Sequence, residues 1–209
     1  MKKFVVIALF FLLFTIPTLS LSGDQLPSGP AVDAIETLNA TLLDCMKRGD
    51  ELGYSGRYGL LEPVMKRYFF FSYMVRKSCG TYWKDLNINQ QQQLLEKYIT
   101  WSVGRYAQRF KKYKGQQFRV VAGELVRGKY MTVISHFVKS DQNTLKFRYV
   151  LLESDGAWLV VDIQVQGVSQ LSLTRAQFKS VLKDQGIDGL LKILDEKISK
   201  LDQGSTDSN

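Results

Sequence analysis

The pattern of apolar residues changes twice along the chain, from a helical repeat to a strand repeat and back to a helical one. From Pro30 onward, apolar side chains recur at three- and four-residue steps, which is typical of one face of a helix that begins with proline. This face comprises Ile35, Leu38, Leu42, Cys45 and Met46. We expect a loop over 49–56 and then a strongly apolar stretch over 58–73, in which Pro63 splits or begins a helix.

The clearest helix is predicted after residue 87. Asn87 can cap it, and Gln90 stands three residues later, which is the spacing of a capping box. The apolar face that follows runs through Leu95, Tyr98 or Ile99, Ser102, Tyr106, Phe110 and Tyr113. The opposite face ends in a basic cluster, Arg105, Arg109, Lys111, Lys112 and Lys114. This cluster is either a solvated face near a helix C-terminus or a surface that docks on anionic headgroups or an acidic partner.

After Gly115 the apolar period switches to two residues, which indicates strands. Four are expected, over 118–122, 130–138, 145–152 and 157–165, and the short turns between them predict an antiparallel meander. Matching the apolar faces of the last two strands predicts that Glu153 pairs with Ala157. That register would place Tyr149 opposite Val161 and Arg148 opposite Asp162.

Two helices are expected after the strands. Thr174 and Gln177 have the spacing of a capping box, and Leu173 and Phe178 stand at the positions of a hydrophobic staple. The segment 186–189 should break this helix, and a final amphipathic helix should follow over 190–201. The order of elements predicts an α+β fold, in which a four-stranded antiparallel curved sheet packs against flanking N- and C-terminal helices.

The first 22 residues are expected to form a secretory signal peptide. Lys2 and Lys3 precede an uncharged apolar run over 4–16, and small residues at positions 20 and 22 suit cleavage before Gly23. A retained anchor helix is the alternative, but the run is short for a membrane span and Pro17 interrupts it. The predicted organisation is a signal peptide over 1–22, a single α+β domain over 23–202 and a disordered tail over 203–209.

Composition and charge narrow the expected partners. The chain is 45% apolar and 12% aromatic, as in a globular protein with a sizeable core. Its formal net charge is +8, and it falls to +6 when Lys2 and Lys3 are removed. An exported basic protein meets little nucleic acid, so anionic membrane surfaces or acidic proteins are the expected partners. Export would also permit a disulfide between Cys45 and Cys79, with two buried free thiols as an equal alternative.

Catalytic chemistry finds no support in the sequence. No P-loop, H-E-x-x-H, C-x-x-C or G-x-S-x-G motif is present. His136, the single histidine, lies in a strand alternation and is interpreted as a structural or surface residue. We therefore expect no enzyme activity, no metal site and no cofactor.

Short motifs spread over residues 30–200 carry a resemblance to a known family. They are Tyr149-x-Leu151, Asp155-Gly156-x-Trp158-x-Val160-x-Asp162, Gly167-Val168-Ser169 and Arg175-x-x-Phe178, with Gly80-x-x-Trp83-x-x-Leu86 upstream. In order and spacing they resemble the MlaC-type, or toluene-tolerance, family of periplasmic lipid carriers. The segments Thr37-Leu38-Asn39-Ala40-x-Leu42-Leu43 and Arg57-Tyr58-x-Leu60-Leu61-x-Pro63-Val64 are most similar to the hopanoid-associated, HpnM-like branch.

The resemblance implies a soluble, non-enzymatic carrier of the periplasm, expected to be a monomer. It implies that a phospholipid or a hopanoid-like lipid lies in an apolar cavity between the sheet and the helices. It also implies that the carrier exchanges this lipid with inner- and outer-membrane transport complexes.

We expect the cavity to be lined by the inward face of the sheet and by the long central helix. The sheet should supply Val133, Phe137, Phe147, Tyr149, Leu151 and Val161, the helix Tyr106 and Phe110, and the aromatic run Phe70, Phe71 and Met74 should close the mouth. The aromatic content is equally compatible with a filled core. Two other functions stay open, an exported adaptor of a membrane transport complex that binds no lipid, and a hydrolase on a similar fold.

Overall fold

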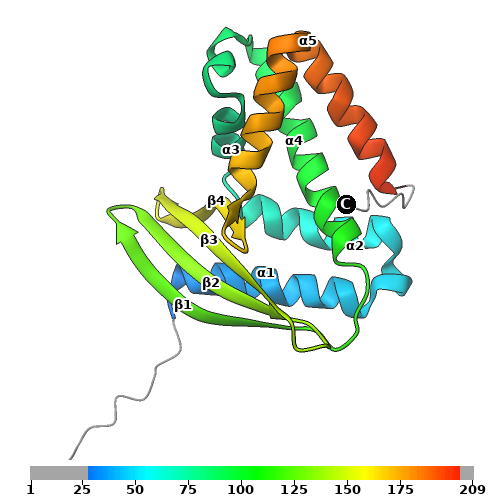
Figure 1. The fold of residues 1–209 in the computed structure, drawn as a ribbon, viewed down its shortest axis with the longest axis vertical. Helices are drawn as coiled ribbons and strands as arrows, with labels where there is room; N and C mark the ends of the chain where they lie inside the picture. Colours follow the sequence, from blue (N-terminus) through cyan, green and yellow to red (C-terminus); the bar gives the residue numbers. More distant parts are fainter. Residues whose placement is uncertain (1–27, 203–209) are drawn as a thin grey trace, which may run out of the picture.

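The computed structural model describes residues 28–202 as helices and strands in the order expected for an α+β protein (Figure 1). The predicted signal peptide and the tail over 203–209 lie outside the described residues. The helices are α1 (Pro30–Lys47), α2 (Gly49–Tyr68), α3 (Phe71–Cys79), a short 3-10 helix (Gly80–Asp85), α4 (Ile88–Arg109) and α5 (Gln170–Asp202). The strands are β1 (Gln117–Arg127), β2 (Tyr130–Val138), β3 (Thr144–Ser154), β4 (Ala157–Val165) and β5 (Val168–Ser169).

The sheet is an antiparallel meander with the strand order β1-β2-β3-β4-β5. Its four long strands and the flanking helices confirm the predicted fold class. Helix α1 lies across the sheet and contacts β1, β2 and β4, while α4 and the two arms of α5 rise beyond it (Figure 1). Between α2 and α3 the backbone N–H of Phe70 donates to the carbonyl of Val160 at 2.9 Å, which joins the helices to the outer edge of β4.

The predicted loop over 49–56 is wrong, because these residues form the first turns of α2. Three glycines suggested a loop, but only Gly53 leaves helical geometry, with φ of 57° and ψ of −170°, and it kinks the helix. Pro63 also lies inside α2 rather than at its start. Helix α1, in contrast, begins at Pro30 as predicted and buries the expected apolar face.

The predicted capping box of α4 is confirmed. The Asn87 side chain accepts from the Gln90 backbone N–H at 3.0 Å, and the Gln90 side chain accepts from the Asn87 N–H at 3.0 Å. The helix ends at Arg109, so Lys111, Lys112 and Lys114 lie in the connection to β1 rather than on a helix face. This part of the basic cluster is therefore not a continuation of the helix.

The predicted register between β3 and β4 is wrong. Ser154 pairs with Ala157 across a two-residue turn, in which Asp155 and Gly156 have φ of 51° and 77°. Such a turn matches the twist of a hairpin and takes priority over face matching. The pairing then shifts at a bulge, so that Leu151 faces Val160 and Val150 faces Asp162. The extra residue in the bulge is Val161.

The predicted start of the C-terminal helix is also wrong. Helix α5 begins at Gln170, where the Ser169 hydroxyl accepts from the Ser172 N–H at 3.0 Å and the Asp162 carboxylate accepts from the Leu171 N–H at 3.0 Å. Thr174 lies inside the helix, and its hydroxyl donates back to the Gln170 carbonyl at 2.9 Å. The predicted break is confirmed at Gly186, whose φ of 66° divides α5 into two arms.

Candidate functional site

The concave face of the sheet is the first component of the candidate site. Because side chains alternate along a strand, each cross-strand row places its apolar members on one face. One row joins Phe118, Phe137 and Leu145, and a second joins Val133, Tyr149 and Ile163. Among the residues on this face, Val133, Tyr149 and Leu151 are at most 1% exposed. The helices cover this face completely at its centre.

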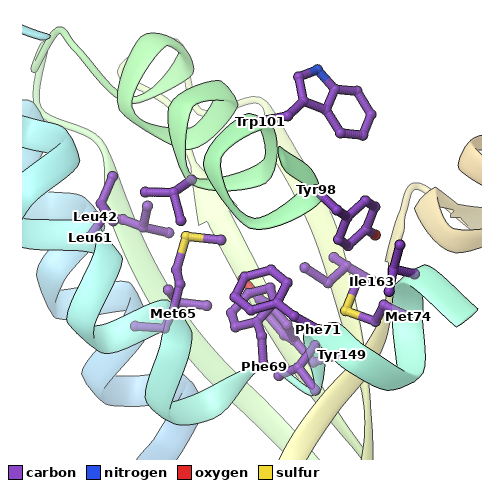
Figure 2. Packing of buried hydrophobic residues seen from close by; sticks show 14 of the residues in the cluster. Leu42, Leu61, Met65, Phe69, Phe71, Met74, Tyr98, Trp101, Tyr149 and Ile163 are labelled. Carbon is purple, nitrogen blue, oxygen red and sulfur yellow. The ribbon is translucent and has the colours of Figure 1, made fainter. Parts of the chain in front are cut away.

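The second component is a set of aromatic side chains from the helices. Phe69 and Phe71 flank the start of α3, and both are buried. Helix α4 presents Tyr98, Trp101 and Tyr106 at steps of three and five residues, and Phe110 follows as its C-cap. Figure 2 shows Phe69, Phe71 and Tyr149 meeting between the helices and the sheet, with Trp101 at the far end of the cluster.

These rings form a continuous aromatic row through the interior. Neighbouring ring centroids lie 5.5 to 6.5 Å apart, within the range in which aromatic side chains attract one another. The aromatic row consists of Trp101, Tyr98, Phe71, Phe69, Tyr106, Phe110, Phe137 and Phe147, in that order. It runs from the helical layer to the end of the sheet beside the C-terminus of α4.

A hollow of about 360 Å³ lies at each end of the aromatic row. The first, the α5 hollow, lies between the two arms of α5 and is lined by Trp101, Phe178, Val181, Leu190 and Leu194, among others. The second, the basic hollow, has an apolar floor of Met46, Phe110, Phe137, Leu145 and Phe147, and a polar rim of Arg109, Lys111, Lys112, Gln116 and Lys139. Both volumes fall within the range of roughly 300–1,000 Å³ that is usual for small-molecule sites.

The aromatic row and the concave face of the sheet carry no charge at neutral pH. Burial raises the pKa of the Tyr106 phenol to about 12 and holds the pKa of Tyr98 and Tyr149 above the usual range. The one polar contact between α1 and the concave face joins neutral groups, since the Asn39 amide donates to the Ser135 hydroxyl at 2.9 Å. Such an interior can hold an apolar molecule, and it offers no group poised for acid–base chemistry.

Most of the predicted lining residues lie together. Eight are buried in one hydrophobic cluster, Phe71, Met74, Phe110, Val133, Phe137, Phe147, Tyr149 and Leu151, and Tyr106 packs against it. Phe70 lies beside this cluster, half-buried and stacked on Tyr73 at 5.7 Å. Val161 is buried at the bulge of β4 and lies outside the cluster, in which Val160 and Ile163 occupy the places expected for it.

Four residues of the aromatic row and its end were not among the predicted lining residues, namely Phe69, Tyr98, Trp101 and Phe178. Phe69 lies next to the predicted Phe70 in the apolar stretch over 58–73. Tyr98 lies on the predicted apolar face of α4, so the helical repeat could have identified it. Phe178 is expected from the sequence as a staple residue and as part of the family motif, not as a lining residue. Its ring centroid lies 6.0 Å from that of Tyr98 and 6.4 Å from that of Trp101. Trp101 lies off the predicted face, and only the fold of α5 over α4 reveals its position.

The described residues add three further findings. Cys45 and Cys79 are buried free thiols, so the open alternative is resolved in favour of no disulfide. Within residues 28–202, no group of three or more His, Cys, Asp or Glu side chains is placed to hold a metal ion. No helix in that range combines the length and apolar character needed to cross a bilayer.

Comparisons with known proteins agree with this architecture. A family model described as MlaC protein matches residues 36–196. No curated protein matches the chain. The fold is similar to the solved structure of a phospholipid-binding protein from Ralstonia solanacearum in complex with a phospholipid, with a TM-score of 0.74 and 20% identity. That similarity covers 83% of this chain and 99% of the other and shows a shared fold.

Proposed function

The chain belongs to the MlaC family of lipid-binding carriers, which are not enzymes, and we propose from this premise that it binds one phospholipid or hopanoid-like lipid. The observation that carries the proposal is the aromatic row, an uncharged series of touching rings with a hollow at each end. The bound lipid would lie between the concave face of the sheet and α3 and α4. The phospholipid in the similar Ralstonia solanacearum structure supports the same class of ligand.

Apolar contact alone can supply the binding energy. Each lipid methylene that leaves water contributes about 0.8 kcal/mol, so a long acyl chain is held without any ionic contact to its tail. The flat faces of the aromatic row suit an extended acyl chain or the fused rings of a hopanoid equally well. The lipid tail therefore needs no charged or hydrogen-bonding partner inside the protein.

Lipid uptake would require the aromatic row to open. The rings now touch one another, and a lipid with two long chains is larger than either hollow of about 360 Å³. Each aromatic contact is worth only about 0.5–1.5 kcal/mol beyond its buried area, and contacts with the lipid would replace it. The burial of acyl methylenes would thus offset the free-energy cost of separating the helical layer from the sheet.

The proposed setting is the periplasm, reached through cleavage of residues 1–22. There the protein would act as a monomeric shuttle that receives and delivers lipid at inner- and outer-membrane transport complexes. The competing function is an adaptor of such a complex that binds no lipid, and the close packing of the rings favours it. Measurement of bound lipid separates the two functions.

A space-filling variant provides the test. Leu145 is half-buried on the floor of the basic hollow, so Leu145→Trp should occupy the hollow without overpacking the centre of the core. Val168, which is 51% exposed on β5 away from the hollow, provides the matched control Val168→Trp. Lipid is extracted from each purified protein after incubation with vesicles and is quantified per mole of chain.

We expect about one lipid per chain in the wild type and in Val168→Trp, and a several-fold loss in Leu145→Trp. Circular dichroism and the midpoint of thermal unfolding confirm that each variant is folded. Lipid-free wild-type protein after incubation would contradict the proposed function and favour the adaptor. If folded Leu145→Trp still binds one lipid per chain, the basic hollow is not part of the lipid-binding site.

A further inference from the structure

The basic hollow combines an apolar floor with four cationic side chains. Phe110, Phe137 and Phe147 of its floor are also the last members of the aromatic row. Arg109, Lys111, Lys112 and Lys139 stand around this floor, and no carboxylate side chain is among the residues that line it. A molecule whose apolar part follows the aromatic row would thus reach the four cations at its polar end.

Within residues 28–202, these four cations take part in none of the ion pairs. Arg48, Lys66 and Lys97 form ion pairs with carboxylates elsewhere on the helices. Lys111 donates only to the neutral side-chain carbonyl of Gln108, at 3.4 Å. Lys139 lies near enough to the exposed Asp141 to attract its carboxylate, but no ion pair among the described residues neutralises the positive charge of the rim. The low-dielectric floor beneath the rim strengthens the field of this charge.

The backbone that carries the cations is fixed in place. A Cβ atom on Gly49 would lie 1.9 Å from the Lys111 carbonyl oxygen, so the segment after α4 packs directly on the first residue of α2. Beneath this contact the buried Arg57 guanidinium donates to the carbonyls of Ala107 at 2.8 Å and Gly49 at 2.5 Å. The arrangement anchors the C-terminal end of α4 and the start of the cationic segment.

We propose that the basic hollow holds the phosphate-bearing headgroup of an anionic lipid and makes the carrier selective for such lipids. The proposal rests on the proposed function, because the lipid tail must occupy the aromatic row. An acidic headgroup with one net negative charge gains from all four cations. A zwitterionic headgroup gains less, because its own ammonium group is repelled by them.

The test is a headgroup competition with the full protein. Vesicles that contain equal amounts of phosphatidylglycerol and phosphatidylethanolamine with matched acyl chains are offered at low salt, and the lipids bound per chain are identified by mass. The test variant is Lys111→Gln/Lys112→Gln/Lys139→Gln. The matched control is Lys179→Gln/Lys183→Gln/Lys192→Gln, which removes the same charge from exposed positions of α5 that line neither hollow.

We expect the wild type and the control to be enriched in phosphatidylglycerol by about tenfold, since the cations attract an anionic headgroup more strongly than a zwitterionic one. The test variant should carry a similar total amount of lipid with enrichment below about twofold. Raising the salt concentration should also reduce the enrichment of the wild type. Inorganic phosphate alone should show no saturable binding by calorimetry.

The outcomes separate this inference from the proposed function. A wild-type protein that carries no lipid contradicts the proposed function itself. Lipid bound without enrichment, or enrichment that persists in the test variant, overturns the headgroup assignment and leaves the lipid carrier intact. Saturable binding of inorganic phosphate that the test variant loses would assign the hollow to a free phosphate and would also overturn it.

Discussion

Arg57 is a charged side chain that the fold buries without an acidic partner in hydrogen-bond contact. Its exposed fraction is 5%, and its hydrogen bonds go to two backbone carbonyls, those of Ala107 and Gly49. The Ala107 carbonyl is in the last turn of α4, where carbonyls lack a partner within the helix. The guanidinium therefore donates hydrogen bonds to two buried carbonyls. Its positive charge also interacts favourably with the negative end of the α4 helix dipole.

We expect Arg57→Ala to lower the free energy of unfolding by about 3 kcal/mol, because two buried carbonyls lose a charged donor. Arg57→Lys should recover only part of this loss, since an ammonium group lacks the planar fork that reaches both carbonyls. Arg76→Ala, at an exposed position of α3, should change stability by less than about 0.5 kcal/mol. Urea unfolding measures all three, and an Arg57→Ala variant as stable as Arg76→Ala would contradict this role.

The two cysteines are expected to be unreactive in the folded protein. Burial raises the pKa of the Cys45 thiol to about 11 and of the Cys79 thiol to about 12, so the thiolate that reacts with labelling reagents is scarce. At pH 8 a thiol reagent should label neither cysteine in native protein and both in denaturant. Labelling of the native protein at the rate of a free thiol, or failure of both to react after denaturation, would contradict buried free thiols.

The same pKa values give a pH dependence. The unfolded thiols lose their protons near pH 9.0, whereas the folded thiols keep theirs until about pH 11 and 12. Stability from these groups is thus fully present below pH 9 and is lost as the pH rises above it, because the unfolded state then binds fewer protons than the native state. Replacement of both cysteines by alanine should reduce this alkaline loss, which urea unfolding at pH 8 and pH 10 would measure.

At the scale of elements, local sequence signals predicted much of the structure where no tertiary contact overrides them. The bounds of β2 and β4 and the cap at Asn87 follow from alternation and from capping chemistry. Thr174 shows the limit of such signals. Its spacing imitates a capping box that would start the helix at residue 175. The Leu171 backbone N–H instead donates to the Asp162 carboxylate of β4, and the helix starts five residues earlier, at Gln170.

The β3–β4 hairpin was mispredicted for a different reason. Apolar faces can be matched in more than one register when a strand contains consecutive valines, as at Val160 and Val161. The turn at Asp155 and Gly156 then decides the pairing, and a bulge restores the burial of Ile163. Because of this bulge, Val160 and Ile163 lie in the hydrophobic cluster of the candidate site and Val161 lies outside it. The alternation of apolar residues alone could not reveal this change.

Two glycines should respond to alanine with opposite signs. Gly156 has φ of 77° in the hairpin turn, so Gly156→Ala should destabilise the protein by about 1 kcal/mol. Gly59 lies exposed within α2 with nothing within 4 Å of an added Cβ, so Gly59→Ala should stabilise it by about 0.5–1 kcal/mol. Thermal unfolding compares the variants, and a shift of both midpoints in the same direction would contradict the assigned backbone geometry.

At the scale of the whole molecule, the helices are tied to one another more closely than to the sheet. A Cβ atom on Gly104 of α4 would lie 2.5 Å from the Tyr54 hydroxyl of α2 and 2.8 Å from Leu201 at the end of α5. Three helices therefore meet with almost no space between them. We expect the interior to open between this helical layer and the sheet, which is where the aromatic row lies (Figures 1 and 2).

Native mass spectrometry tests most directly whether this interior holds a lipid. Protein expressed from the full chain is incubated with phospholipid vesicles, separated from them by size exclusion and sprayed from a non-denaturing buffer. We expect a mass of one chain plus one lipid, which dissociates to the bare chain only under strong collisional activation. The mass of the bare chain alone, from protein shown to be folded, would mean that the interior holds no lipid.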